Sequence, residues 1–147
     1  MSQLPIADVI EIQQLLAKYA VAMTRNDVET VMAEVFTPDG TYSAFGATYP
    51  LYDFPALVKV APKGLFLTGT PLLDLDGDAG SGYQPLLFVD QTNHHMRMGW
   101  YTDAYVRTGQ GWRLKTRSMT FLRRSGAADA GKPHDPLRPQ PTAEPAG

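Results

Sequence analysis

The chain has 147 residues, a formal net charge of −2 and no cysteine. This length suits one domain with a buried core, the near-neutral charge lacks the basic excess of a nucleic-acid-binding domain, and the absence of cysteine excludes disulfides and thiolate chemistry. With only three histidines and neither a transmembrane pattern nor a signal-peptide pattern, we expect a cytoplasmic protein without metal, other cofactor, nucleic-acid partner or membrane partner.

Two helices are predicted near the start of the chain. Residues 8–24 carry apolar side chains at helical spacing, and Asp8 with Glu11 forms a candidate capping box. Residues 27–36 repeat the apolar spacing, and the turn-forming letters TPDG follow at once. We therefore expect a helical hairpin that ends at this turn.

Strand signals dominate the rest of the chain. Residues 41–45 predict a short strand, and Asp53 before Pro55 predicts the start of a third short helix. Four longer strand-like segments follow and are separated by loop signals: residues 65–75, 82–89, 94–107 and 111–124. Helices followed by an antiparallel meander indicate an α+β fold. The proline-rich residues 125–147 predict a flexible or surface-draped tail.

The segment 94–107, HHMRMGWYTDAYVR, alternates two kinds of side chain, which a strand would place on opposite faces. The polar set includes His95, Arg97, Tyr101, Asp103 and Tyr105, and the apolar set includes Met96, Met98 and Trp100. One interpretation makes the apolar face the core and leaves the polar face in solvent. In the other interpretation, the polar face lines an enclosed pocket and the apolar face contacts another subunit.

The order of elements, with LLAKYAVAMTRNDVETVMAEVFTPDGTY near the start and YTDAYVRTGQGWRLKTR near the end, resembles the SnoaL-like branch of the nuclear transport factor 2-like superfamily. The resemblance covers roughly residues 6–124. It implies a cone-shaped α+β barrel, in which a strongly bent antiparallel or mixed sheet wraps around N-terminal helices, with a ligand cavity at the open end. It also implies a single domain over residues 1–124, commonly dimeric, with the polar face of 94–107 turned inward and Met96, Met98 and Trp100 at the dimer interface.

The resemblance also predicts an irregularity in the last strand. A tight turn at residues 109–110 pairs Tyr105 with Leu114, and regular pairing from there would turn Arg117 outward. Related proteins place an equivalent residue inward, which requires a β-bulge near residues 115–116. We therefore predict this bulge and an inward-facing Arg117.

Similar enzymes, such as scytalone dehydratase, a lindane-type dehydrochlorinase and bile acid dehydratase, pair an Asp at the end of the first helix with a strand His. The carboxylate orients the imidazole so that it can take a proton. The matching positions here fall near Thr24 and Phe66, which supply neither group. The chain is therefore expected to lack this dyad.

Other side chains are candidates for chemistry. Tyr19 and Tyr42 stand where relatives present phenols to the cavity, and a phenol can donate to a carbonyl or a developing enolate oxygen. Alternatively, both are core aromatics. His95 with Arg97 is the candidate general base, because imidazole titrates near neutral pH, unless both lie at an exposed strand start.

An inward Arg117 requires an acidic partner or an anionic ligand, since a buried cation is costly without one. Asp103 or Asp27 could be that partner, and a purely structural ion pair is the alternative to a catalytic role. The predicted catalytic set is His95, Arg97, Asp103, Arg117 and Tyr19. The predicted substrate-binding set is Met23, Tyr42, Phe66, Tyr101, Met119 and Phe121.

These residues favour a cofactor-independent lyase, isomerase or cyclase that acts on a small, largely apolar, oxygenated substrate such as a polyketide, terpenoid or steroid-like ring. One alternative is a non-catalytic module that binds a small molecule or only dimerises, which the missing dyad favours. The other is an enzyme like limonene epoxide hydrolase, because Asp103 near Arg97 resembles part of its Asp-Arg-Asp arrangement, although a second carboxylate is not evident.

Overall fold

The computed structural model describes residues 4–123, 126, 128–129 and 141. The helical elements are α1 (Ile6–Thr24), α2 (Val28–Thr30), the π-helical turn η1 (Val31–Val35), the 3-10 turn η2 (Leu51–Asp53) and α3 (Phe54–Val60). The strands are β1 (Phe36–Ala44), β2 (Ala47–Pro50), β3 (Gly64–Thr68), β4 (Leu72–Asp76), β5 (Ala79–Asp90), β6 (Met96–Thr108), β7 (Gly111–Leu122) and β8 (Ala128–Asp129). Apart from β8 and two single residues, the predicted tail lies outside the described residues.

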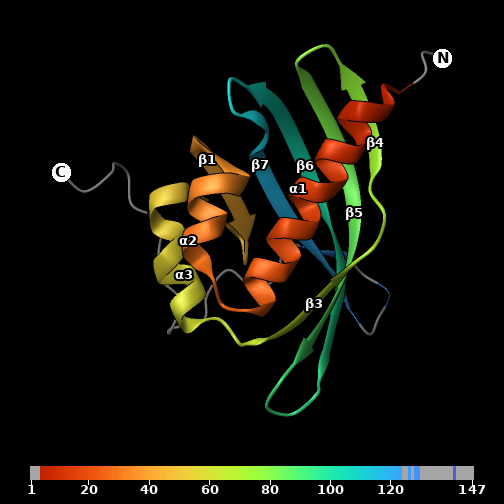
Figure 1. Ribbon diagram of the computed structural model, residues 1–147. Helices are drawn as coiled ribbons and strands as arrows, with labels where there is room; N and C mark the ends of the chain where they lie inside the picture. The colour runs from red at the N-terminus through yellow and green to blue at the C-terminus, as the bar shows by residue number, and fades with distance from the viewer. Residues whose placement is uncertain (1–3, 124–125, 127, 130–140, 142–147) are drawn as a thin grey trace.

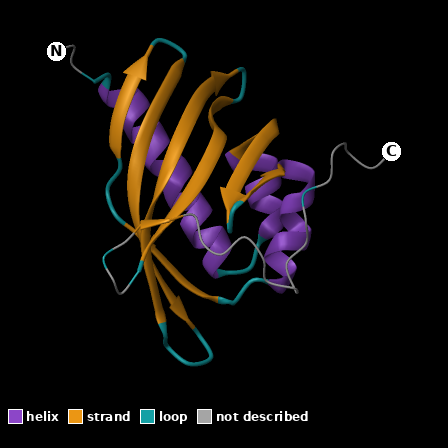
Figure 2. Ribbon diagram, turned by 180° about the vertical axis from the view of Figure 1, so that it is seen from behind, coloured by secondary structure: helices purple, strands orange, loops and turns teal. Residues whose placement is uncertain are grey.

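The strands form one curved, unclosed sheet with the order β2-β1-β7-β6-β5-β3, while β4 also pairs with β5 and β8 with β7. Neighbouring strands are antiparallel except for β1 and β7, which are parallel. Helix α1 lies across the concave side of this sheet, and α2 and α3 stand together beside β1 (Figure 1). The opposite view shows the strands in front of α1 (Figure 2). The fold is therefore α+β with a mixed sheet, as predicted.

The core fills the space between α1 and the concave side of the sheet. Residues buried on α1 recur at helical spacing and form the stripe that faces the strands: Ile12, Leu15, Leu16, Tyr19, Ala20 and Ala22. On β6, Gly99, Tyr101, Asp103 and Tyr105 are buried, whereas Met96 and Met98 on the other face are exposed. Burial along β6 thus follows the strand alternation, and the polar set of residues 99–105 faces inward as predicted.

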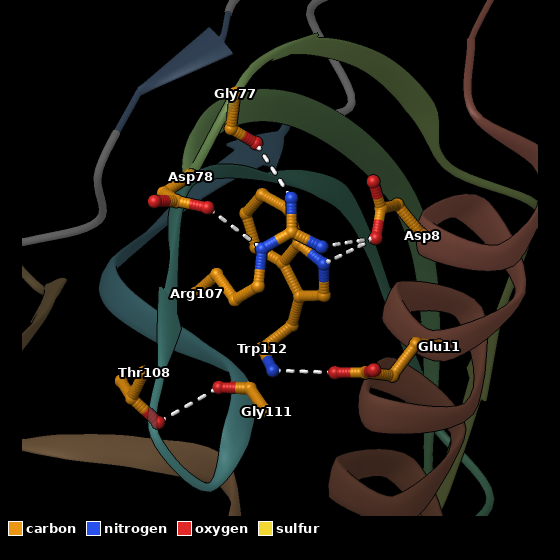
Figure 3. Close-up of polar contacts among 8 residues, drawn as sticks. All are labelled: Asp8, Glu11, Gly77, Asp78, Arg107, Thr108, Gly111 and Trp112. Carbon is orange, nitrogen blue, oxygen red and sulfur yellow. Dashed lines mark hydrogen bonds and ion pairs between the residues drawn. The ribbon is translucent and has the colours of Figure 1, made fainter.

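The predicted capping box at the start of α1 is wrong. Helix α1 begins at Ile6, and no side chain caps its first turn. Asp8 instead accepts hydrogen bonds from Arg107 Nη1 at 2.6 Å and Trp112 Nε1 at 3.1 Å, and Glu11 accepts one from the Trp112 backbone N–H (Figure 3). Both carboxylates are therefore engaged by the β6–β7 hairpin, and they tie the first turns of α1 to the sheet.

The predicted end of the second helix at TPDG also needs correction. Strand β1 begins at Phe36, so these four residues lie inside a strand rather than in a turn that follows a helix. Phe36 is paired with Leu114 and Thr41 with Thr116, which leaves four residues of β1 opposite one residue of β7. The turn-forming letters thus produce an irregular stretch within the strand. The helical segment before them is shorter than predicted and ends at Val35 as a π-helical turn.

The predicted bulge in β7 is confirmed. Ala104 pairs with Thr116 and Tyr105 with Leu114, so Lys115 is the extra residue. The bulge reverses the parity of the strand after it, and Arg117, Met119 and Phe121 are buried on the concave side. Asp103 consequently stands directly opposite Arg117.

Candidate functional site

A cavity opens between the concave side of the sheet, α1 and α3. Its volume is about 70 Å³, well below that of the pockets that hold drug-sized ligands, so it encloses only part of a ring-containing molecule and the rest would extend through its open end. All six predicted substrate-binding residues line it, together with Tyr19 and Arg97. The remaining lining residues are Phe45, Phe54, Leu57, Val58, Ala61, Pro62, Leu86 and Phe88. The lining is thus almost entirely apolar or aromatic.

Three phenols supply most of the polar groups of this lining. Tyr19 on α1 and Tyr101 on β6 are each 1 % exposed, and their rings meet edge to face with centroids 5.8 Å apart. Tyr42 on β1 is half-buried, and its ring packs edge to face on Phe54 at 5.4 Å. Phenols from a helix and two strands therefore meet in one cavity.

A buried ion pair lies behind this phenol cluster. Arg117 Nε and Nη2 donate to the two carboxylate oxygens of Asp103 at 2.8 and 2.9 Å, and Nη2 also donates to Gln84 Oε1 at 2.8 Å. Tyr105 donates its hydroxyl proton to Asp103 at 3.1 Å. The bidentate geometry and the added hydrogen bonds are what a fully buried pair requires to offset its desolvation.

The guanidinium of Arg117 also contacts the two fully buried phenols. Its central carbon lies 3.6 Å from the ring centroid of Tyr101 and 4.5 Å from that of Tyr19. Among the described residues, its Nη1 has no hydrogen-bond partner. The stacking connects the ion pair to the cavity, although neither Asp103 nor Arg117 belongs to the lining.

Burial sets the protonation states of this region. Loss of solvent raises the pKa of Tyr19 and Tyr101 well above that of a free phenol. Tyr101 adds to the increase in the pKa of Tyr19, Tyr42 adds to the increase in that of Tyr101, and Arg117 opposes both. Burial by itself would lower the pKa of Arg117, but Asp103 outweighs it and the net pKa is raised. The phenols are therefore neutral hydrogen-bond donors at neutral pH, and Arg117 stays a cation.

The structure separates His95 from the other predicted catalytic residues. His95 is exposed just before β6, its backbone N–H bonds the Asn93 side chain, and it is not part of the cavity lining. Arg97 is also exposed but does reach the cavity. Asp103 pairs with Arg117 rather than with Arg97, so the Asp103–Arg97 arrangement considered under the epoxide-hydrolase alternative does not form.

The two positions expected for the missing Asp–His dyad are indeed neighbours. The backbone N–H of Phe66 on β3 donates to the Thr24 hydroxyl at the end of α1, at 3.0 Å. A threonine and a phenylalanine thus occupy the place where the resemblance puts a carboxylate and an imidazole. The described residues contain no cluster of three or more His, Cys, Asp or Glu that could hold a metal ion.

Sequence reasoning missed several cavity residues. Phe54, Leu57 and Val58 come from the short helix α3, whose packing against the sheet depends on contacts far along the chain. Phe45 lies in the two-residue turn between β1 and β2 with φ at 59°, a conformation that this turn normally assigns to Asn or Gly. The sequence feature that could have located Phe45 in a turn is the adjacent Gly46, which indicates a tight hairpin once β2 is recognised as a strand.

The family model described as a SnoaL-like domain matches residues 5–118 of this chain. The chain belongs to the SnoaL-like family. The uncharacterized protein Rv2910c of Mycobacterium tuberculosis is 32% identical over 127 residues, with 78% of this chain and 86% of that protein covered.

Solved structures share the fold. A nuclear transport factor 2-like protein with a cystatin-like fold from Novosphingobium aromaticivorans superposes with a TM-score of 0.72 at 21% identity, covering 82% of this chain and 87% of that one. A protein from the same organism that is named after scytalone dehydratase superposes with a TM-score of 0.70 at 12% identity, covering 96% and 97%. At these identities the likeness shows the fold alone. Among the described helices, none has the length and apolar character needed to cross a membrane.

Proposed function

We propose that the chain is a cofactor-independent enzyme of the lyase, isomerase or cyclase type that acts on a compact, largely apolar, oxygenated substrate. The observation that carries this proposal is the phenol cluster of Tyr19, Tyr42 and Tyr101 in an otherwise apolar cavity, with the Arg117 cation stacked behind two of the rings. Membership of the SnoaL-like family supports small-molecule binding in this cavity.

The chemistry follows from the cluster's hydrogen-bonding capacity. A substrate carbonyl in the cavity would accept a hydrogen bond from the Tyr101 hydroxyl, whose ring packs against that of Tyr19. When a proton leaves the adjacent carbon, negative charge develops on the carbonyl oxygen, and a neutral phenol held in a dry site stabilises it. The cavity lining contains neither a carboxylate nor an imidazole, so hydroxide from solvent, which reaches the substrate through the open end of the cavity, takes the proton and becomes water. Return of a proton to a different carbon of a conjugated enolate completes an isomerisation. Departure of a leaving group from the next carbon into solvent, with its bonding electron pair, completes an elimination.

A non-catalytic binding module is the second candidate. The same absence of a carboxylate or imidazole from the lining favours it, since a cavity with hydrogen-bond donors but no general base can hold an oxygenated ligand without converting it. Catalysis and binding alone differ in one measurable respect, which is whether a carbon-bound proton of a cavity ligand exchanges.

The test uses 2-indanone, a compact ketone whose protons next to the carbonyl exchange with deuterium. We expect the protein in D₂O to accelerate this exchange over buffer, as followed by NMR. Tyr101→Phe should slow the protein-dependent exchange about 100-fold, the order expected for loss of one oxyanion donor. Binding of 2-indanone, measured by calorimetry, should weaken far less.

Tyr83→Phe is the matched control, because Tyr83 is 54% exposed and does not line the cavity. Its exchange rate should equal that of the wild type. If 2-indanone binds but its exchange is not accelerated, the enzyme proposal is refuted and the non-catalytic binding module is supported. Equal rates in Tyr101→Phe and the wild type would remove Tyr101 from the mechanism.

We also propose that the chain forms a dimer through the convex face of the sheet. Met96 and Met98 are 65% and 51% exposed there, and Trp100 on the same face is half-buried. Register extends the apolar area across neighbouring strands, since Met98 lies between Leu87 of β5 and Leu122 of β7. An apolar surface of this kind suits a two-fold interface in which each subunit presents the same patch.

A further inference from the structure

The phenols of the cavity and its single charged side chain differ sharply in burial. Tyr19 and Tyr101 are each 1 % exposed, whereas Arg97 is an exposed residue of the strand start. All three line the same cavity, which therefore has a deep end at the phenols and an open end at Arg97. A ligand that fills the cavity would meet neutral donors at one end and a cation at the other.

Arg97 is held at this open end by a row of aromatic rings. Phe66 of β3 pairs with Phe88 of β5, and Phe88 pairs with Arg97 of β6, so the three side chains stand next to one another on the concave face. The rings of Phe66 and Phe88 meet edge to face at 5.0 Å, and the guanidinium carbon of Arg97 lies 5.9 Å from the Phe88 centroid. Stacking on an aromatic ring orients the planar guanidinium while leaving its N–H groups available.

The charge of Arg97 is not neutralised by an ion pair within the described part of the chain. No acidic side chain there forms an ion pair with it, and no other residue of the cavity lining carries a formal charge. Arg107, Arg117 and Arg123, by contrast, each bind an aspartate. A guanidinium at the mouth of an apolar cavity is a ready partner for a planar carboxylate.

We infer that the ligand of this cavity is an amphipathic anion: an apolar ring body with an oxygen for the phenols at the deep end and a carboxylate for Arg97 at the open end. This inference rests on the proposed function and narrows its substrate class to ring-containing keto or hydroxy acids. Arg97 is then the residue that selects the charged substrate over a neutral analogue, while the phenols act on its other end.

Cinnamate and cinnamamide are the probes, because they have the same apolar body and differ in charge. By calorimetry at low salt, the wild type should bind cinnamate about fivefold more tightly than cinnamamide, the order expected for a partly exposed ion pair. Arg97→Gln should remove this difference by weakening cinnamate and leaving cinnamamide unchanged. Added salt should weaken cinnamate binding to the wild type alone.

Arg113→Gln serves as the control, because it removes the same charge as Arg97→Gln. Arg113 lies at the start of β7 and is not part of the cavity lining. This variant should keep the preference for cinnamate. Equal binding of the two probes to the wild type would overturn the anion inference and leave the cavity as a neutral binding site. A preference that persists in Arg97→Gln would overturn the role of Arg97. Binding of neither probe would overturn this inference, whereas the exchange of 2-indanone decides the proposed function separately.

Discussion

At the scale of single residues, Arg117 carries the most structural information. Its side chain is fully buried, binds both oxygens of Asp103 and stacks on the rings of Tyr19 and Tyr101. A cation buried this completely is tolerated because its partner is equally buried and well oriented. The ion pair therefore supports the position of the two phenols as well as the sheet.

Removing one member of this pair should be costly. In Asp103→Asn the Arg117 cation stays buried with a neutral partner, and we expect the free energy of unfolding to fall by about 3 kcal/mol. Urea denaturation measures this change. Asp78→Asn is the matched control, since Asp78 also pairs with an arginine but its side chain is 79% exposed, and its loss should cost less than about 1 kcal/mol. Similar decreases in the free energy of unfolding in the two variants would contradict a special role of the buried Asp103–Arg117 pair.

At the scale of elements, the bulge in β7 decides which side chains reach the concave face. Before the bulge, Trp112 and Leu114 are buried, and after it Arg117, Met119 and Phe121 are buried. The extra residue, Lys115, lets both halves of one strand face the core despite their different parity. Without it, either the first half or the second half of β7 would present the wrong face.

Deleting Lys115 should therefore be far more damaging than changing its side chain. The deletion forces the residues after position 115 onto the convex face or slips the whole β6–β7 pairing, and we expect loss of the cooperative thermal transition. Lys115→Ala keeps the residue count and removes only the exposed ion pair with Asp39, so it should leave the free energy of unfolding nearly unchanged. Near-UV circular dichroism during heating distinguishes the two outcomes. A deletion variant that melts like the wild type would show that the bulge is dispensable.

At the scale of the whole molecule, the two faces of the sheet differ: the concave face lines the cavity, and the convex face exposes apolar side chains. The concave face carries the cavity and the buried ion pair, whereas the convex face exposes Met96, Met98, Leu65, Leu67 and Leu122. Exposed apolar side chains that gather on one sheet face favour an interaction surface. The proposed dimer would bury this area and leave the cavity open.

Sedimentation equilibrium tests the dimer. We expect a dimeric wild type, and Trp100→Glu should weaken association by about 2 kcal/mol or more, because a buried charge replaces an aromatic anchor. Far-UV circular dichroism checks that the variant keeps its fold. Thr48→Glu adds the same charge at an exposed position of β2 and should leave the dimer unchanged. A monomeric wild type would refute the proposal, and a dimeric Trp100→Glu would place the interface on another face.

The sequence by itself determined the features that depend on local periodicity. The spacing of apolar residues from Ile12 to Tyr19 identified α1, and the alternation in residues 94–107 separated the concave from the convex side chains. These patterns survive in a single sequence because each element must bury one face. The family resemblance added the bulge near Lys115, which periodicity alone would have placed in a regular strand.

Tertiary structure alone decided the features that depend on contacts between distant segments. Asp8 and Glu11 look like a capping box locally, but the β6–β7 hairpin, about a hundred residues later, binds both carboxylates. His95 has the chemistry of a general base, yet its place before β6 leaves it outside the cavity. Phe54 enters the cavity only because α3 packs there. A local pattern states what a side chain can do, whereas the partners that long-range packing brings to it determine what it does.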